Sequence, residues 1–137
     1  MSQTQSHGDQ GGLKGRVRMF KRPADSEDED DWEKFHDQEN LIPDDGLNKY
    51  RDLIRGSHTS VPNAFAYGTD GTAEAAGDSS LGNKVIEKEF SGDSAPSVGV
   101  LELRGALNSI EPESQPVDFE EFAVLFEDGT IASRITF

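Results

Sequence analysis

The sequence predicts a mainly β fold: an antiparallel β-sandwich-like domain with one short helix and an extended N-terminal arm. Three observations support this prediction. Apolar residues recur at three- and four-residue steps in one segment only, which ends at Gly56. After Gly56 the apolar residues instead alternate with polar ones, which is the pattern of half-buried strands. Near the C-terminus, Asp128-Gly129 separates two strand-like runs, as in a tight β-hairpin.

Length and composition divide the chain into two parts. Its 137 residues predict one domain. Only 30 of them are Leu, Ile, Val or Phe, which is too few for a large core, and 26 of these 30 lie in residues 40–137. We therefore expect an N-terminal arm over residues 1–39, made of a flexible tail, a strand and an acidic loop, and a β-rich structural module over residues 40–137.

Charge is distributed unevenly between these parts. The chain has 13 Lys and Arg against 27 Asp and Glu, a net charge of −14. Residues 1–22 are net basic, whereas residues 23–137 carry about −18, which repels phosphate backbones and argues against nucleic-acid binding by the main domain. The basic arm alone could contact an anionic partner. Such acidity also fits a halophilic protein, since concentrated salt screens charge repulsion.

Several classes of protein are excluded by what the sequence lacks. Without cysteine, the chain has no disulfide framework, no thiolate metal site and no thiol nucleophile. No apolar run approaches the roughly 18–20 residues of a membrane span, and the first residues lack the apolar stretch of a secretory signal. We expect no membrane insertion and no export by the secretory route.

In the arm, the pattern predicts a flexible tail followed by two strands. Residues 1–13 are rich in Gln, Ser and Gly and show no periodicity. Residues 14–21 form a strand in which Val17 and Met19 alternate with polar neighbours, and Pro23 ends it. Seven acidic residues between Asp25 and Glu33 predict a solvated loop, followed by a short strand over 32–36.

One helix is predicted over residues 45–55. Its apolar stripe consists of Leu47, Tyr50, Leu53 and Ile54. Asp44 or Asp45 is the expected N-cap and Gly56 the expected end.

The rest of the chain reads as strands and turns. A strand over 64–67 is closed by a turn at Gly68, Asp70 and Gly71, and residues 73–82 form a loop. Further strands are predicted over 84–90 and 98–107, the latter with Leu101, Leu103 and Leu107 on one face.

The C-terminal hairpin is the strongest local prediction. Residues 119–126 and 130–137 flank a two-residue type I′ turn at Asp128-Gly129. A bulge is expected at Glu120-Glu121, because Phe119 is out of phase with the strand that follows. The residues expected to share a face are Phe122, Val124 and Phe126 on one strand, and Ile131, Ile135 and Phe137 on the other.

No pattern of catalytic or ligand-binding residues is found. His7, His36 and His58 lack a recognisable orienting partner and are expected at the surface. The acidic run lacks the glycine that an EF-hand calcium loop requires at its sixth position. Residues 77–84 come close to a phosphate-binding loop, but Asn83 shifts the required lysine by one position. Glu120 and Glu121 point to opposite faces of a strand, or share a bulge, and do not form an acid–base pair. We expect no enzyme, and no catalytic, cofactor-binding or metal-binding residues.

The order of short motifs in residues 40–137 resembles a small structural module of tail fibre, collar and baseplate proteins of tailed phages and related archaeal viruses. The matching motifs are Asn40-Leu41-Ile42, Asp45-Gly46-Leu47, the segment from Phe65 to Ala73, Ala76-Gly77-Asp78 and Leu81-Gly82-Asn83. The end of the chain matches the EAGLF…DGTLLAR ending of that family in residues 121–126, residues 128–134 and Phe137. The chain departs from the pattern at Asp70, which stands between Thr69 and Gly71, and at Asn63-Ala64, where the family has a β-branched residue.

The resemblance implies assembly rather than catalysis. It implies a homo-oligomer that binds other virion structural proteins and is located in the virion, assembled in the host cytoplasm. The candidate structural turn and assembly residues are Asn40, Gly46, Gly68, Gly71, Asp128, Gly129 and Phe137. The edge of the C-terminal hairpin is a candidate pairing site for another chain. The alternatives are a receptor- or glycan-binding adhesin module and a capsid decoration or vertex protein.

Overall fold

The computed structural model describes residues 13–108, 110–112 and 117–137, and it is mainly β with antiparallel sheets, as predicted. The predicted tail lies outside the described residues, except for Leu13. Within the described ranges there is one α-helix, α1 (Asp44–Ile54), and a short 3₁₀ turn, η1 (Glu29–Asp31). The strands are β1 (Gly15–Lys21), β2 (Glu33–Asn40), β3 (Pro62–Gly68), β4 (Lys84–Glu89), β5 (Gly92–Ser94), β6 (Glu102–Arg104), β7 (Glu121–Phe126) and β8 (Ile131–Thr136).

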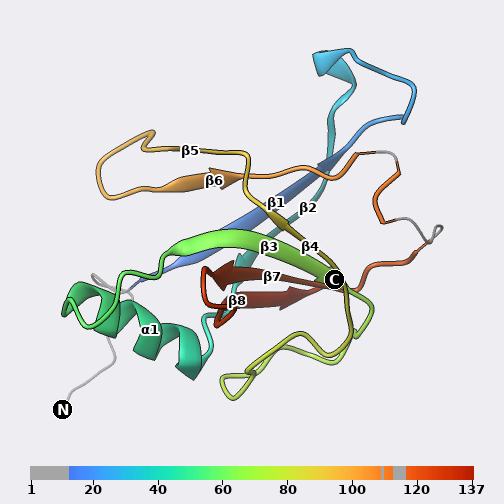
Figure 1. Ribbon diagram of the computed structural model, residues 1–137. Helices are drawn as coiled ribbons and strands as arrows, with labels where there is room; N and C mark the ends of the chain where they lie inside the picture. The colour runs from blue at the N-terminus through green and yellow to red at the C-terminus, as the bar shows by residue number, and fades with distance from the viewer. Residues whose placement is uncertain (1–12, 109, 113–116) are drawn as a thin grey trace.

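A four-stranded antiparallel sheet in the order β4-β3-β7-β8 forms the centre of the molecule (Figure 1). Two further pairs, β1-β2 and β5-β6, form separate two-stranded sheets. The two central strands pair with Phe65 opposite Val124 and Tyr67 opposite Phe122. Strands β3 and β7 are distant in the sequence, so the sheet depends on long-range pairing.

The two faces of the central sheet carry side chains of different size. On one face, here called the aromatic face, Phe65, Tyr67, Phe122, Val124 and Ile135 pack together. On the other, here called the alanine face, the cluster consists of Ala64, Ala66, Ala123, Leu125 and Ile131. Because alanine side chains are short, the segment 69–83 lies close against this second face, with Leu81 packed on it.

The β1-β2 hairpin covers part of the aromatic face. Val17 and Met19 are buried, as their alternation predicts, and they join the cluster of Phe65, Phe122 and Ile135. The base of the arm therefore belongs to the core, while its acidic tip projects away from the body of the molecule (Figure 1). Strand β2 runs to Asn40 and is longer than the predicted strand over 32–36, because β1 offers a pairing partner along its whole length.

Helix α1 begins one residue earlier than predicted and ends next to Gly56, whose φ of 78° suits a helix C-terminus. The predicted aspartate N-cap is wrong, because Pro43 occupies the cap position and makes no side-chain cap bond. Asp44 and Asp45 instead lie in the first turn, where negative charge interacts favourably with the helix dipole.

The C-terminal hairpin is present, but its turn differs from the prediction. Gly129 N–H donates to the Phe126 carbonyl and Phe126 N–H donates to the Thr130 carbonyl, which closes a three-residue loop rather than a two-residue one. Strand β8 also contains a bulge: Leu125 pairs with Ile131 but Val124 pairs with Ser133, so that Ala132 is one residue in excess. Ile131 therefore packs on the alanine face and Ile135 on the aromatic face, so the face they were predicted to share does not exist.

Two other strand predictions are wrong in detail. No register shift occurs at Glu120-Glu121, because β7 begins at Glu121 and Phe119 precedes it, with its ring stacked on that of Tyr67 at 4.9 Å between centroids. The predicted strand over 98–107 is reduced to the three residues of β6, which pair with β5 apart from the central sheet. As a result Leu101 is 64% exposed.

Candidate functional site

A buried ion pair joins the two strands of the C-terminal hairpin. Glu121 opens β7 with no exposed surface, and Arg134 of β8 is 3% exposed. The guanidinium donates to Glu121 Oε1 from Nε at 3.2 Å and from a terminal nitrogen at 3.1 Å. Charged residues are almost never this buried unless they are paired, so the pair is a defining feature of the interior.

The same carboxylate attaches the segment 69–83 to the sheet. Glu121 accepts hydrogen bonds from the backbone N–H groups of Asp70 at 3.0 Å, Gly82 at 2.8 Å and Asn83 at 2.8 Å. Arg134 adds an ion pair to Asp78 at 3.1 Å and a hydrogen bond to the Asp70 carbonyl at 3.2 Å. With five donors around it, the Glu121 carboxylate has no capacity left to act as a base toward a substrate.

The predicted site residues Gly68 and Gly71 lie next to this cluster. A Cβ on Gly68 would collide with the Glu121 carboxylate and the Asn83 carbonyl, so glycine makes room for the buried charge. A Cβ on Gly71 would lie 3.0 Å from Glu120 Oε1. Sequence reasoning selected the glycines but missed Glu121 and Arg134 as a site.

Three other predicted residues lie at the contact between the helix and β8 or in the turn that leads into β8. A Cβ on Gly46 would lie 2.9 Å from the carbonyl oxygens of both Ile131 and Ala132, so glycine permits the close approach of α1 to this strand. Asp128 forms an ion pair with Lys49 of α1 and accepts a hydrogen bond from Thr130 N–H at 3.0 Å. The Lys49 bond and the Thr130 donors lower the pKa of Asp128 to about 2. Gly129 has a φ of 90°, which completes the turn.

The last two predicted residues lie elsewhere. The Phe137 ring is 5.3 Å from the His36 ring and 6.4 Å from the Tyr67 ring. Asn40 ends β2 opposite Gly15, and its amide group fills the space that a Cβ at Gly15 would need. The seven predicted residues therefore support several separate turns and contacts rather than one site.

The two described histidines are half-buried rather than exposed, and both are bonded within the chain. His58 Nε2 lies 2.9 Å from the Lys49 carbonyl, and its Nδ1 accepts from Ser60 N–H at 3.1 Å. His36 Nε2 lies 2.7 Å from Gln38 Oε1. His7 falls outside the described residues.

Two further features are absent from the part of the chain that the structure describes. No group of three or more His, Asp or Glu side chains is placed to hold a metal ion. No helix there has the length and apolar character to cross a membrane.

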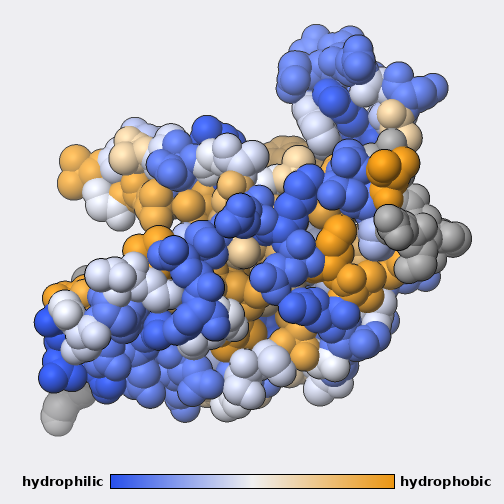
Figure 2. Space-filling view, in the orientation of Figure 1, coloured by the Kyte–Doolittle hydropathy of each residue, from blue (hydrophilic) through white to orange (hydrophobic). Residues whose placement is uncertain are grey.

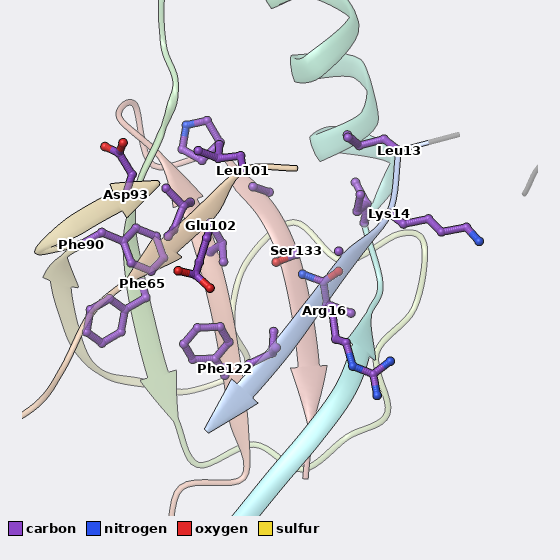
Figure 3. Close-up of a pocket in the computed structure, with 18 of the residues that line it drawn as sticks. Leu13, Lys14, Arg16, Phe65, Phe90, Asp93, Leu101, Glu102, Phe122 and Ser133 are labelled. Atoms are coloured by element: carbon purple, nitrogen blue, oxygen red, sulfur yellow. The ribbon is translucent and has the colours of Figure 1, made fainter. Parts of the chain in front are cut away.

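An open groove of about 940 Å³ lies between the aromatic face, β1 and the β5-β6 hairpin. Figure 3 shows Phe65, Phe90 and Phe122 gathered on one side of it and Ser133 on the other. Leu101 of the β5-β6 hairpin and Leu53 of α1 also line the groove. Apolar side chains line the hollow between the β5-β6 hairpin and the body of the molecule (Figure 2).

Two buried polar atoms lining this groove have no hydrogen-bond partner. They are Oδ1 of Asn40 and Oγ of Ser133. Native proteins leave few such groups unsatisfied, so each calls for an explanation.

Apolar side chains are also exposed on both projecting hairpins. The β1-β2 hairpin exposes Phe20 and Phe35 by about half, and Trp32 by 39%. At the β5-β6 turn Val98 is fully exposed. Sequence reasoning missed both the groove and this turn. The available signal was Ser94–Leu101, eight residues without a charge in a chain that is 29% charged.

No family model, curated protein or solved structure matches this chain.

Proposed function

We propose that the chain is a non-enzymatic virion structural protein that assembles into a symmetric tail, baseplate or fibre-attachment component. The observation that carries the proposal is the exposed apolar surface on the groove and the two projecting hairpins. Soluble monomers rarely expose large contiguous apolar patches, and such patches mark sites of protein–protein contact.

The use of the charged side chains supports an assembly role over catalysis. Glu121, Arg134 and Asp128 are bonded to the chain itself, where they fix turns and a long segment in place. Catalytic groups need free bonding capacity directed into a cleft. Glu121 and Arg134 also belong to the motif in which the C-terminal hairpin resembles the tail-protein module.

The shape of the arm fits contact with neighbouring subunits or other virion proteins. A hairpin anchored by Val17 and Met19 carries exposed aromatic rings beyond the edge of the body. At the tip the Arg22 guanidinium lies 4.5 Å from the Trp32 ring, so this aromatic surface is held in a defined position.

The oligomeric state tests the proposal. Light scattering after size exclusion, together with electron microscopy, is carried out from low to multimolar NaCl, because salt screens the repulsion between chains of charge −14. We expect particles of fixed size and closed symmetry. A monomer under all conditions would refute the proposal, and glycan or receptor binding by that monomer would favour an adhesin. Saturable turnover of a substrate would also refute it.

A further inference from the structure

The β5-β6 hairpin is a two-stranded sheet of three residues per strand. At its base Gly105 lies against the Phe65 ring, but Val98 at the turn is fully exposed and Val100 and Leu101 are at least 47% exposed. Isolated two-stranded hairpins are marginal in water, and exposed valine and leucine add nothing to their stability. The turn of this hairpin therefore lacks a covering surface within its own chain.

The groove beside the hairpin has the properties of a peptide-binding surface. Its floor is formed by aromatic rings, of which Phe65 and Phe122 are already buried within the chain, and its walls include the exposed Val61 and the half-buried Leu53. Apolar side chains of an incoming segment would cover the apolar residues that line the groove and remain exposed, namely Leu13, Val61, Val100 and Leu101.

The charges around the groove favour a second copy of this chain as the occupant. The charged residues that line it are balanced: Lys14, Arg16 and Arg18 against Glu39, Asp93 and Glu102. The chain as a whole has 13 basic and 27 acidic residues, so the groove is much less acidic than the average surface. Two copies of so acidic a protein approach best where their charges balance. The uncharged segment Ser94–Leu101 meets no repulsion there.

We propose that the turn of the β5-β6 hairpin, residues 95–101, inserts into the groove of a second copy of the chain. Val98 of one copy contacts the exposed apolar side chains along the groove of the other, including Val61. This contact rests on the proposed assembly function and specifies the surface that carries it.

Cross-linking tests which surfaces meet. The chain contains no cysteine, so single cysteines can be introduced without background. Val98→Cys protein is mixed with Val61→Cys protein, which carries its thiol on the groove wall, and a short bismaleimide is added. We expect a heterodimeric product, since each chain has only one thiol. In the control, Ala24→Cys at the exposed tip of the other hairpin replaces Val98→Cys, and no product is expected.

A charge at the hairpin turn tests the energetics. Val98→Asp changes a side chain with no contacts to lose within its own chain, so the monomer retains its fold. Burying a carboxylate against the apolar wall of the groove should weaken self-association at least about tenfold. Ile110→Asp is the matched control, because Ile110 is 72% exposed and does not line the groove. It should change the association constant less than about twofold.

The outcomes separate this inference from the proposed function. If the protein assembles but Val98→Asp assembles equally well, or if Val98 and Val61 do not cross-link, the groove contact is refuted and the assembly role stands. If Val98 and Val61 cross-link but the chains form open assemblies of variable size rather than particles of closed symmetry, the contact is upheld and the proposed symmetric component is refuted. A monomer under all conditions overturns both.

Discussion

Replacing Glu121 by glutamine should unfold the protein far more easily than its small change in shape suggests. The glutamine side chain keeps the volume of glutamate but loses its charge and turns one acceptor oxygen into a donor NH₂ group. Glu121 Oε1 accepts from Arg134 and from Gly82 N–H, and Oε2 accepts from Asp70 N–H and Asn83 N–H. Whichever position the NH₂ takes, at least two donors lose their acceptor.

The expected loss is about 3–5 kcal/mol, the usual cost of removing one partner from a buried ion pair. Arg134 is 3% exposed and keeps only Asp78 as a counter-charge, so water cannot compensate it fully. Such a loss is a large part of the roughly 5–15 kcal/mol that stabilises a typical domain. For a chain of this size it lowers Tm by roughly 10–20 °C.

Urea unfolding and backbone hydrogen exchange measure the effect. Glu120→Gln is the matched control, because Glu120 is the exposed neighbour and the chemical change is the same. The control should stay within about 0.5 kcal/mol of wild type. In Glu121→Gln the amides of Asp70, Gly82 and Asn83 should exchange faster as well. Equal stability of the two variants, or unchanged protection of those amides, would refute the role assigned to this carboxylate.

Three further substitutions test how the turns and the helix contact are built. Gly46→Ala gains about 1 kcal/mol of helix propensity but places a Cβ within 2.9 Å of two β8 carbonyl oxygens. Urea unfolding should therefore show a net stability loss of about 1–3 kcal/mol. The control Gly77→Ala, which has open space around it, should leave the stability unchanged. Because Gly129 has a φ of 90°, Gly129→Val should lower the free energy of unfolding by about 2 kcal/mol, and Gly129→Asn should lower it clearly less. Equal stability losses of the two variants in thermal unfolding would exclude backbone conformation as the cause. Asp128 has a pKa lowered from 3.8 to about 2, so it stabilises the fold above pH 4, and this contribution is lost as the pH falls toward 2. Because its side chain is 42% exposed, the contribution is below about 1 kcal/mol, and Asp128→Asn should show a smaller stability loss over that pH interval in acid titrations.

Local sequence patterns were enough to predict the helix and strands that depend mainly on interactions between residues close in the sequence. The helix over 44–54 follows from its apolar spacing and its terminal glycine, and β1 follows from the alternation of Val17 and Met19. The turn type at Gly129 was not predictable in the same way, because two- and three-residue loops both favour Asp-Gly. Nor was the bulge at Ala132 predictable; it places Ile131 and Ile135 on opposite faces, because one inserted residue reverses the alternation of side chains.

The candidate site depends on contacts between distant segments. Arg134 stands in an apolar strand, which marks it as unusual, but its partners at Asp70, Asp78 and Glu121 come from other parts of the chain. The groove is lined by residues from segments between β1 and β8, so no short stretch of sequence could predict it. The exposed Val98 was missed for a related reason: an apolar run predicts a strand, and only the tertiary arrangement shows whether the sheet includes it.

The order of strands in the central sheet also constrains when the protein can fold during synthesis. Strand β4 can cover one edge of β3 early, but β7, which covers the other edge, begins only at Glu121, so the ribosome must make all of residues 69–120 before that edge is paired. Throughout that interval Phe65 and Tyr67 lack the Phe122 ring, which later packs on both. Such long-range pairing slows folding and prolongs the exposure of an unpaired strand to other nascent chains. The high density of negative charge along the chain, which keeps such chains apart, is then as useful before folding as after it.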